Sequence, residues 1–185
     1  MTEEVLNDNL SDDQKITDEV ILQLKPLIFR TISDDDIIKF IHLQCQKVLE
    51  IAKTKNDSKE VARAINLQTL DILGTVMGES RKVDIDYLVS QMQDSGYAFV
   101  VLHNHPSDMH FSVLDIKTFI NSDNLTILIV LGNLGSIYVL EKTRLPELNE
   151  ILSIKKTLLN WQNKIISFET VIEHLGKFGI VYNEI

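Results

Sequence analysis

The sequence predicts an α/β fold, in which a β-sheet packs against helices and further helices extend the chain at both ends. Apolar residues recur at helical spacing in some stretches and form short runs of strand length in others. Between residues 33 and 142 these stretches follow the order helix, hairpin, helix, strand, helix, hairpin. With 185 residues, 44% of them apolar, the chain can bury a substantial core as one domain with extensions.

The N-terminal part of the chain is predicted to be an acidic arm followed by two helices. Residues 1–17 are polar and rich in acids, so we expect a loose, flexible arm with little to bury. Apolar residues recur at helical spacing over residues 20–28, although Pro26 breaks or kinks this pattern. A capping residue followed by acids then opens a second helix, which we expect over residues 33–53.

Two hairpins are predicted, one on each side of the middle of the sequence. Residues 60–66 and 70–77 are expected to form an antiparallel pair, and residues 82–85 a short edge strand. The apolar run over residues 125–131 is typical of a strand buried on both faces, and residues 136–140 are expected to pair back on it. These segments would supply most of the sheet.

A central strand and two helices are expected between the hairpins. Asp86 is predicted to cap a helix over residues 86–94, which Gly96 would close. The apolar run over residues 98–102 is typical of a buried strand, and a helix is predicted over residues 113–121. The central strand would therefore be followed directly by a loop and a helix.

Residues 146–185 change in character and are predicted to form a C-terminal helical extension. One long helix is expected over residues 148–165 and another over residues 168–175, followed by a short tail. Their apolar faces, like that of the helix over residues 33–53, could pack on the domain or form a homodimer.

Composition and charge exclude several classes of protein. The formal net charge of −9 argues against a general binder of nucleic acids, whose affinity depends largely on neutralising phosphates with Lys and Arg. Cys45 is the only cysteine, which rules out a disulfide framework and a cysteine-based zinc site. No apolar stretch approaches the length of a membrane span, and the N-terminus lacks the apolar core of a signal peptide. We therefore expect a soluble, cytoplasmic protein.

Reactive side chains gather where the central strand is predicted to end. Residues i and i+2 of a strand point the same way, so His103 and His105 can present two imidazoles to one point in space. Pro106 cannot donate to a sheet ladder and should end the strand. Ser112 then stands where a helix N-cap would be, and Asp115 falls in the first helical turn.

These residues form a candidate metal site. Two imidazoles and one carboxylate, with a fourth position left to water, are the usual ligands of a catalytic zinc ion. His103, His105 and Asp115 are therefore the candidate ligands of one zinc ion per chain. The alternative is that both histidines are satisfied polar residues at a strand end.

His-Asn-His-Pro-Ser over residues 103–107, followed by Phe-Ser-x-x-Asp over residues 111–115, resembles the JAB/MPN (JAMM) metalloprotease superfamily. The likeness covers about residues 59–142 and is nearest to the prokaryotic branch, which includes RadC-type proteins and the JAB domains of phage and toxin-like proteins. It implies a mixed β-sheet of the cytidine-deaminase-like kind in a domain over residues 18–145. A short loop, with Asp108 where RadC-type sequences have glycine, favours the phage- and toxin-associated members.

The resemblance also implies a general base and an oxyanion donor. Glu60, at the start of the first predicted strand, stands where the family has its catalytic glutamate. Asp71 and Glu79 remain alternatives, because the stretch between them echoes a pattern of eukaryotic members, and the base could also be absent. Ser112 would hydrogen-bond the developing oxyanion, and it could cap the following helix at the same time.

The function that this resemblance implies is zinc-dependent hydrolysis of amide bonds by a metallopeptidase or isopeptidase. The substrate would be a peptide or protein, such as a ubiquitin-like conjugate. One alternative is a JAB-fold module that has lost catalysis and serves in an assembly. Another is a RadC-like role in DNA metabolism, which the acidic balance does not favour. Asp108 and His110 could contact substrate, but exposure to solvent is the simpler expectation for both.

Overall fold

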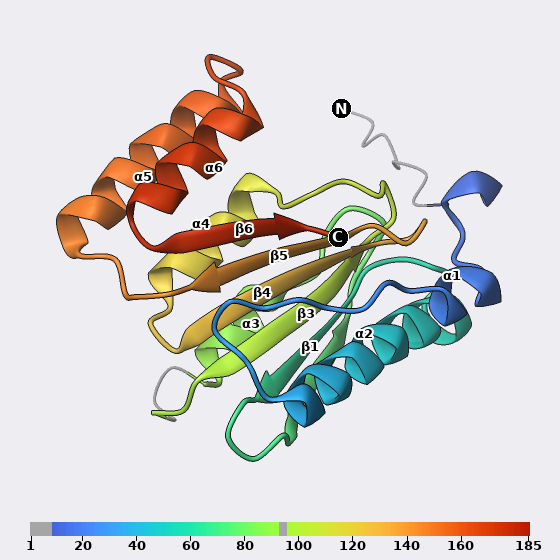
Figure 1. The fold of residues 1–185 in the computed structure, drawn as a ribbon. Helices are drawn as coiled ribbons and strands as arrows, with labels where there is room; N and C mark the ends of the chain where they lie inside the picture. Colours follow the sequence, from blue (N-terminus) through green and yellow to red (C-terminus); the bar gives the residue numbers. More distant parts are fainter. Residues whose placement is uncertain (1–8, 93–95) are drawn as a thin grey trace.

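The computed structural model describes residues 9–92 and 96–185 as an α/β protein with a mixed six-stranded sheet flanked by helices (Figure 1). The predicted fold class is confirmed at this level. The helices are α1 (Asp18–Leu22), α2 (Asp35–Lys55), α3 (Ile85–Ser90), α4 (Val113–Asn121), α5 (Leu148–Gln162) and α6 (Phe168–Lys177), with a 3₁₀ turn at Asp12–Gln14. The strands are β1 (Val61–Asn66), β2 (Ile72–Met77), β3 (Phe99–His105), β4 (Leu125–Gly132), β5 (Ile137–Lys142) and β6 (Ile180–Glu184).

The strand order in the sheet is β2-β1-β3-β4-β5-β6, and both predicted hairpins are present as antiparallel pairs. Only the central pair, β3 and β4, is parallel among these strands, with α4 as the crossover between them. The carboxyl ends of β3 and β4 therefore meet at the same edge of the sheet. His105 pairs there with Gly132, so the end of β3 opens directly into the loop before α4.

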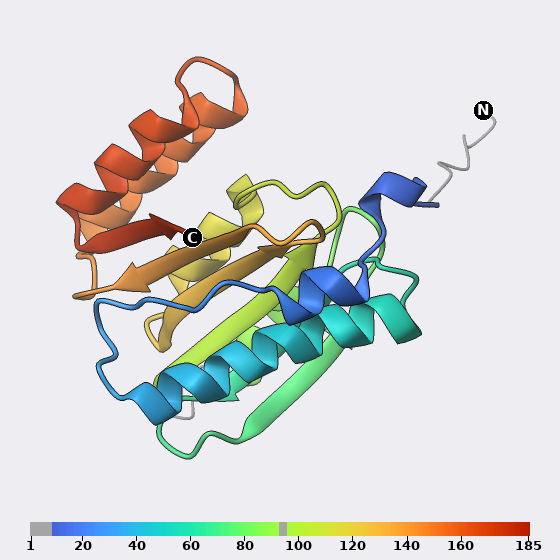
Figure 2. The same cartoon turned by 45° about the vertical axis from the view of Figure 1, so that its right-hand side comes forward.

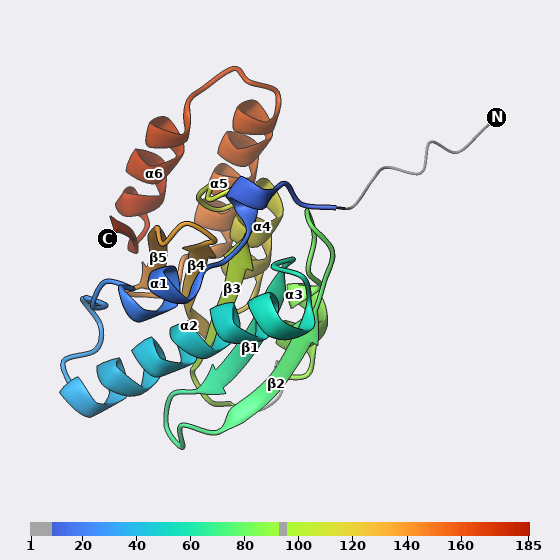
Figure 3. The same cartoon turned by 90° about the vertical axis from the view of Figure 1, so that its right-hand side faces the viewer.

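Helices cover both faces of the sheet, so the fold has three layers (Figures 2 and 3). The α2 face carries α2 and the N-terminal segment, and it buries Val100 and Leu102 of β3. The opposite face, which we call the site face, packs against the helices α3 to α6 and buries Val101. Because side chains alternate along a strand, His103 and His105 point to the same side as Val101.

The N-terminal arm is more closely attached than predicted. Of the loose arm expected over residues 1–17, residues 1–8 lie outside the described part of the chain. Ile16, by contrast, is buried, and its N–H donates to the Ser58 hydroxyl at 3.0 Å. The part of the arm from residue 9 onward is therefore fastened to the body of the protein.

The helix predicted over residues 20–28 is wrong beyond Leu22, where α1 ends. Pro26 cannot continue a helix, because it lacks an N–H and its ring clashes with the preceding turn. Leu24 and Leu27 are instead buried on the α2 face of the sheet. Their apolar spacing reflects burial of a non-helical segment that crosses this face.

The predicted edge strand over residues 82–85 is also absent. Residues 82–84 belong to the loop between β2 and α3, Ile85 is the first residue of α3, and Val83 within the loop is buried. The tight approach of this loop to the end of β2 depends on Gly78. A Cβ at Gly78 would lie 2.3 Å from the Lys82 carbonyl oxygen and 2.7 Å from the Val83 Cα. Burial of Val83 against the hairpin gives this stretch its strand-like apolar pattern.

Helix α3 begins earlier than predicted, because Asp84 rather than Asp86 caps it. The Asp84 Oδ1 accepts a backbone N–H of the first turn at 2.9 Å. The helix ends at Ser90, and residues 93–95, which the prediction included in part, lie outside the described residues. Gly96 has a positive φ of 70° but lies beyond the end of the helix, so it does not close it.

The C-terminal residues form the two predicted helices, but the expected tail is a strand. β6 pairs antiparallel with β5 and becomes the outer strand of the sheet. Helix α5 contacts α4 and α6, and α6 contacts β6. The C-terminal helices therefore share the core of the site face, and the end of α5 lies near the loop that follows β3.

Candidate metal centre

Three side chains from two elements converge at the end of β3. The Nε2 atoms of His103 and His105 are 3.0 Å apart. The His103 Nε2 is 3.4 Å from the Asp115 Oδ1, and the His105 Nε2 is 3.5 Å from the Asp115 Oδ2. All three residues are buried. They form a group that could hold a metal ion, so the structure brings together the three ligands predicted from the sequence.

Local hydrogen bonds hold the Asp115 carboxylate in place. The Ser112 Oγ accepts the Asp115 N–H at 3.1 Å, and the Ser112 N–H donates to the Asp115 Oδ2 at 2.6 Å. This reciprocal capping box begins α4, as the sequence spacing indicated. The Ser112 hydroxyl accepts in this box, and its side chain also hydrogen-bonds the Asp115 carboxylate, which helps to lower the pKa of Asp115. The role of Ser112 toward an oxyanion stays a prediction.

The His105 ring is oriented by the backbone of the loop that follows it. Its Nδ1 lies 3.0 Å from the carbonyl oxygen of Met109. A carbonyl oxygen only accepts, so the His105 Nδ1 donates and the Nε2 lone pair faces the cluster. Ligand histidines in metalloproteins usually donate their second N–H in this way.

Asp108 fastens this loop to the turn between β4 and β5, although it was expected to be solvated. Its Oδ1 accepts the Leu134 N–H at 2.9 Å, and its Oδ2 accepts the Ser136 hydroxyl at 2.7 Å. Gly132 leaves the space that this needs, because a Cβ there would lie 1.6 Å from the Asp108 Oδ1. The sequence carries little signal for this contact, since the partners of Asp108 come from a distant turn. Asp108 therefore positions the Met109 carbonyl that orients His105.

Glu60 lies beside the cluster, immediately before β1. Ala62 pairs with His103, and strand alternation puts Glu60 on the site face at the same end of the sheet. Glu60 is only 6% exposed, and its carboxyl group accepts a hydrogen bond from the Val83 backbone. Burial raises the pKa of Glu60 to about 7, although the charge of His103 opposes the rise. A carboxyl group with this pKa can accept and release a proton near neutral pH.

The two alternative bases lie away from the cluster. Asp71 is exposed, and its carbonyl oxygen accepts the N–H of Asn66 at the far end of the hairpin. Glu79 is also exposed, and although its backbone pairs with that of Glu60, its side chain does not line the cavity described below. Of the three candidates, the structure brings Glu60 to the predicted ligands.

Electrostatics favour the ligand-competent protonation states of Asp115 and His105, but they favour the protonated form of His103. Burial alone would raise the pKa of Asp115, but the facing His103 holds it well below its usual range, so the carboxylate is ionised. Burial and the charge of His103 lower the pKa of His105 to about 4, which keeps its ring neutral at pH 7. Burial also opposes protonation of His103, yet Asp115 and Glu60 together raise its pKa. A cation bound at the three ligands would compete with that proton.

The donor atoms lie close enough together to hold one metal ion. With one ligand atom from each of the three side chains, all of these atoms lie within 4.8 Å of one another. Nitrogen and oxygen donors about 2.0 Å from a tetrahedral zinc would lie about 3.3 Å from one another, so small shifts of the side chains would bring them around such an ion. The His103 Nδ1, across the ring from the cluster, is buried and has no hydrogen-bond partner among the described residues, so His103 lacks the second contact that orients His105.

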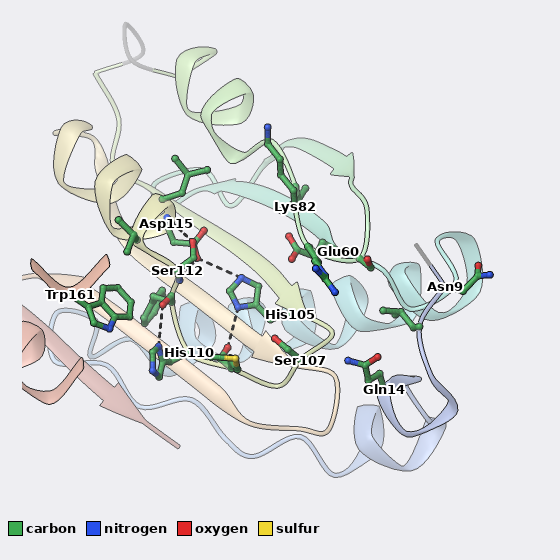
Figure 4. A pocket seen from close by; sticks show the side chains of 18 residues that line it. Asn9, Gln14, Glu60, Lys82, His105, Ser107, His110, Ser112, Asp115 and Trp161 are labelled. Atoms are coloured by element: carbon green, nitrogen blue, oxygen red, sulfur yellow. Dashed lines mark hydrogen bonds and ion pairs between the residues drawn. The ribbon is translucent and has the colours of Figure 1, made fainter. Parts of the chain in front are cut away.

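A cavity of about 570 Å³ opens beside the cluster (Figure 4). Glu60, His105, Ser112 and Asp115 all line it, so two of the predicted ligands share one cavity with both predicted catalytic residues, while His103 is fully buried behind them. Trp161, from the end of α5, lines the same cavity, and no sequence pattern indicated that it would. The position of Trp161 beside the cavity depends on how the C-terminal helices pack.

No protein-family model, curated protein or solved structure matches the chain. Within the described ranges, the structure contains no helix that is both long and apolar enough to cross a membrane. Any functional conclusion therefore depends on the geometry of the site and on the motif that first indicated it.

Proposed function

We propose that this protein is a zinc-dependent hydrolase of amide bonds in peptides or proteins, with the JAB/MPN-type fold that its motif resembles. The observation that carries the proposal is the position of Glu60. Its buried carboxyl group shares a cavity with His105 and Asp115 and interacts electrostatically with His103, and burial raises its pKa to about 7. A structural metal site has no need of a proton acceptor of this kind beside it.

His103, His105 and Asp115 would hold the ion, which when bound would supply Lewis acidity and make water a better nucleophile at neutral pH. Glu60 would accept a proton from the attacking water and transfer it to the departing amine. The Ser112 O–H would donate to the carbonyl oxygen as that oxygen gains negative charge. The products are a carboxylic acid and an amine, so the reaction consumes one water and needs no redox partner.

The test combines metal content with peptide hydrolysis in matched variants. After reconstitution with zinc, elemental analysis should find about one zinc per chain in the wild type and in Glu60→Gln, and much less in His103→Ala. Hydrolysis of a defined fluorogenic peptide library should fall about 10²- to 10⁴-fold in Glu60→Gln. Glu79→Gln removes the same charge from an exposed neighbour and should keep both properties.

Three outcomes would change the proposal. Absence of zinc from the reconstituted wild type would overturn the metal site and the hydrolase together. Stoichiometric zinc without hydrolysis of any peptide would favour the catalytically inactive binding module. Hydrolysis that survives in Glu60→Gln would remove Glu60 from the mechanism.

A further inference from the structure

The cavity beside the metal cluster has walls of opposite chemical character. Trp161 lies on one side of His105, and Lys82 lies on another side, near Glu60 (Figure 4). Met109 and Leu114 also line the cavity, and they are 58% and 46% exposed. Covering exposed apolar surface beside a candidate reaction centre with an apolar group of a ligand is energetically favourable.

The aromatic wall is held rigidly from behind. The His110 ring stacks on Phe168 of α6, with ring centroids 3.5 Å apart and planes 6° from parallel. Trp161 in turn lies against both rings, with centroid distances of 5.9 Å to His110 and 5.3 Å to Phe168. These contacts fix the indole without enclosing it, since Trp161 is only partly buried and lines the cavity. A fixed, partly open aromatic surface favours binding of a bulky apolar side chain.

The opposite wall is cationic. Arg81 and Lys82 line the cavity from the loop between β2 and α3, and both are exposed. The loop is held by the hydrogen bond from the Glu79 N–H to the Lys82 carbonyl, at 2.8 Å. No carboxylate among the described residues forms an ion pair with either side chain. In a chain with a net charge of −9, two adjacent cations without acidic partners favour an anionic ligand group at this position.

We propose that this cavity selects a peptide with a bulky aromatic or aliphatic side chain on one side of the metal cluster and a carboxylate on the other. Trp161 contacts the apolar side chain, and Arg81 and Lys82 bind the carboxylate. The carboxylate belongs either to an acidic residue or to the C-terminus of the peptide. This inference rests on the proposed function, because it takes the cavity to be the substrate site.

Trp161 provides a direct probe, because it is the only tryptophan of the chain. We would titrate the Glu60→Gln protein, with and without zinc, with blocked peptides in which Phe and Glu are two or three residues apart, in both orders. The fluorescence of Trp161 should change on binding. Replacing Phe by Ala, or Glu by Gln, should weaken binding at least tenfold. A Gln peptide with a free C-terminus distinguishes a terminal carboxylate from an acidic side chain.

Variants assign each preference to its wall, with binding measured by the anisotropy of labelled peptides. Trp161→Ala should lower the affinity for the Phe peptide about tenfold and leave the affinity for the Ala peptide unchanged. Trp161→Phe should bind both peptides with the affinities of the parent protein. Arg81→Gln combined with Lys82→Gln should abolish the preference for Glu over Gln. Leu159→Ala changes an exposed apolar residue of the same helix outside the cavity and should have no effect.

Lys156→Gln combined with Lys177→Gln makes the same charge change as the Arg81 and Lys82 pair at exposed positions elsewhere. This control should keep the preference for Glu. Equal affinity for all peptides, or no binding of any, would overturn the inference. Peptide selection without cleavage by the wild type would support the inference and reject the hydrolase, whereas cleavage without selection would do the reverse.

Discussion

Glu60, immediately before β1, and Glu141, within β5, are both buried glutamates of the same sheet region, at 6% and 1% exposure, but their surroundings differ. The Glu141 carboxylate accepts the N–H groups of Arg30 and Thr31 at 2.9 to 3.0 Å and the Thr31 hydroxyl at 2.7 Å. The hydrogen bond that supports the Glu60 carboxylate comes from Val83, and desolvation raises its pKa to about 7. Both residues are buried, so the difference between them lies in how many hydrogen-bond donors face each carboxylate.

The comparison separates a structural acid from a candidate reactive one. Glu141 is satisfied as an anion and ties the N-terminal segment to β5, so its negative charge stabilises the fold. Glu60 is poorly compensated as an anion, and ionising it costs stability. An acid held at such a cost beside a metal-ligand cluster is a candidate for function.

The largest effect on stability is expected from Glu141→Gln. The amide keeps the shape of the carboxylate but has no charge. Its NH₂ group replaces one acceptor oxygen, so donor hydrogens would face the N–H donors of Arg30 and Thr31. We expect the free energy of unfolding to fall by about 3 kcal/mol, as for loss of hydrogen bonds to a charged group. Urea denaturation at pH 8 measures it, and an unchanged midpoint would show that the segment is not held by this carboxylate.

The substitution of Gln for Glu at position 60 should raise the free energy of unfolding, in contrast to the substitution at position 141. Glu60 has its pKa raised in the folded state from 4.5 to about 7, so the folded protein binds more protons than the unfolded one in that interval. The contribution of Glu60 to the free energy of unfolding should therefore fall as the pH rises from about 4.5 to about 7. In chelator-treated protein at pH 8, Glu60→Gln should raise the free energy of unfolding by about 2 kcal/mol.

At pH 4 Glu60 is protonated in both states, so the stabilising effect of Glu60→Gln should nearly vanish there. Denaturation of both proteins across this pH range tests the sign directly. Equal stabilities at pH 8 would mean that ionised Glu60 is better compensated than its surroundings indicate.

A smaller effect is expected from Asp108→Ala, which separates positioning from folding. Asp108, like Glu141, has a carboxylate with good donors, yet it acts on the loop that orients His105. We expect zinc affinity to fall about tenfold, as when a group that orients a metal ligand is lost. Competition with a metal indicator measures the affinity, and the ¹⁵N shifts of His105 report its tautomer.

Asp84→Ala is the matched control for Asp108→Ala, because it removes a loop acid that caps α3 away from the ligands. It should lower stability slightly and leave zinc affinity unchanged. Unchanged zinc affinity and an unchanged His105 tautomer in Asp108→Ala would reduce Asp108 to a structural contact.

The sequence by itself determined the features that depend on a few neighbouring residues. The alternation of His103 and His105 along a strand, the break at Pro106 and the capping box of Ser112 with Asp115 are local, and each was predicted. Local geometry is set by backbone sterics and short-range hydrogen bonds, which the residue types reveal. The α/β class and both hairpins follow from the same kind of pattern.

Only the tertiary structure decided what surrounds these residues. The burial of Glu60 depends on the pairing of β1 with β3 and on a loop that passes close to Gly78. The contact of Asp108 depends on a turn at Gly132, and Trp161 reaches the cavity because α5 packs beside α4. Such distances between remote segments follow from strand order and side-chain packing, and no short stretch of sequence contains both partners. The motif therefore identified the candidate ligands, and the fold placed Glu60, Asp108 and Trp161 around them.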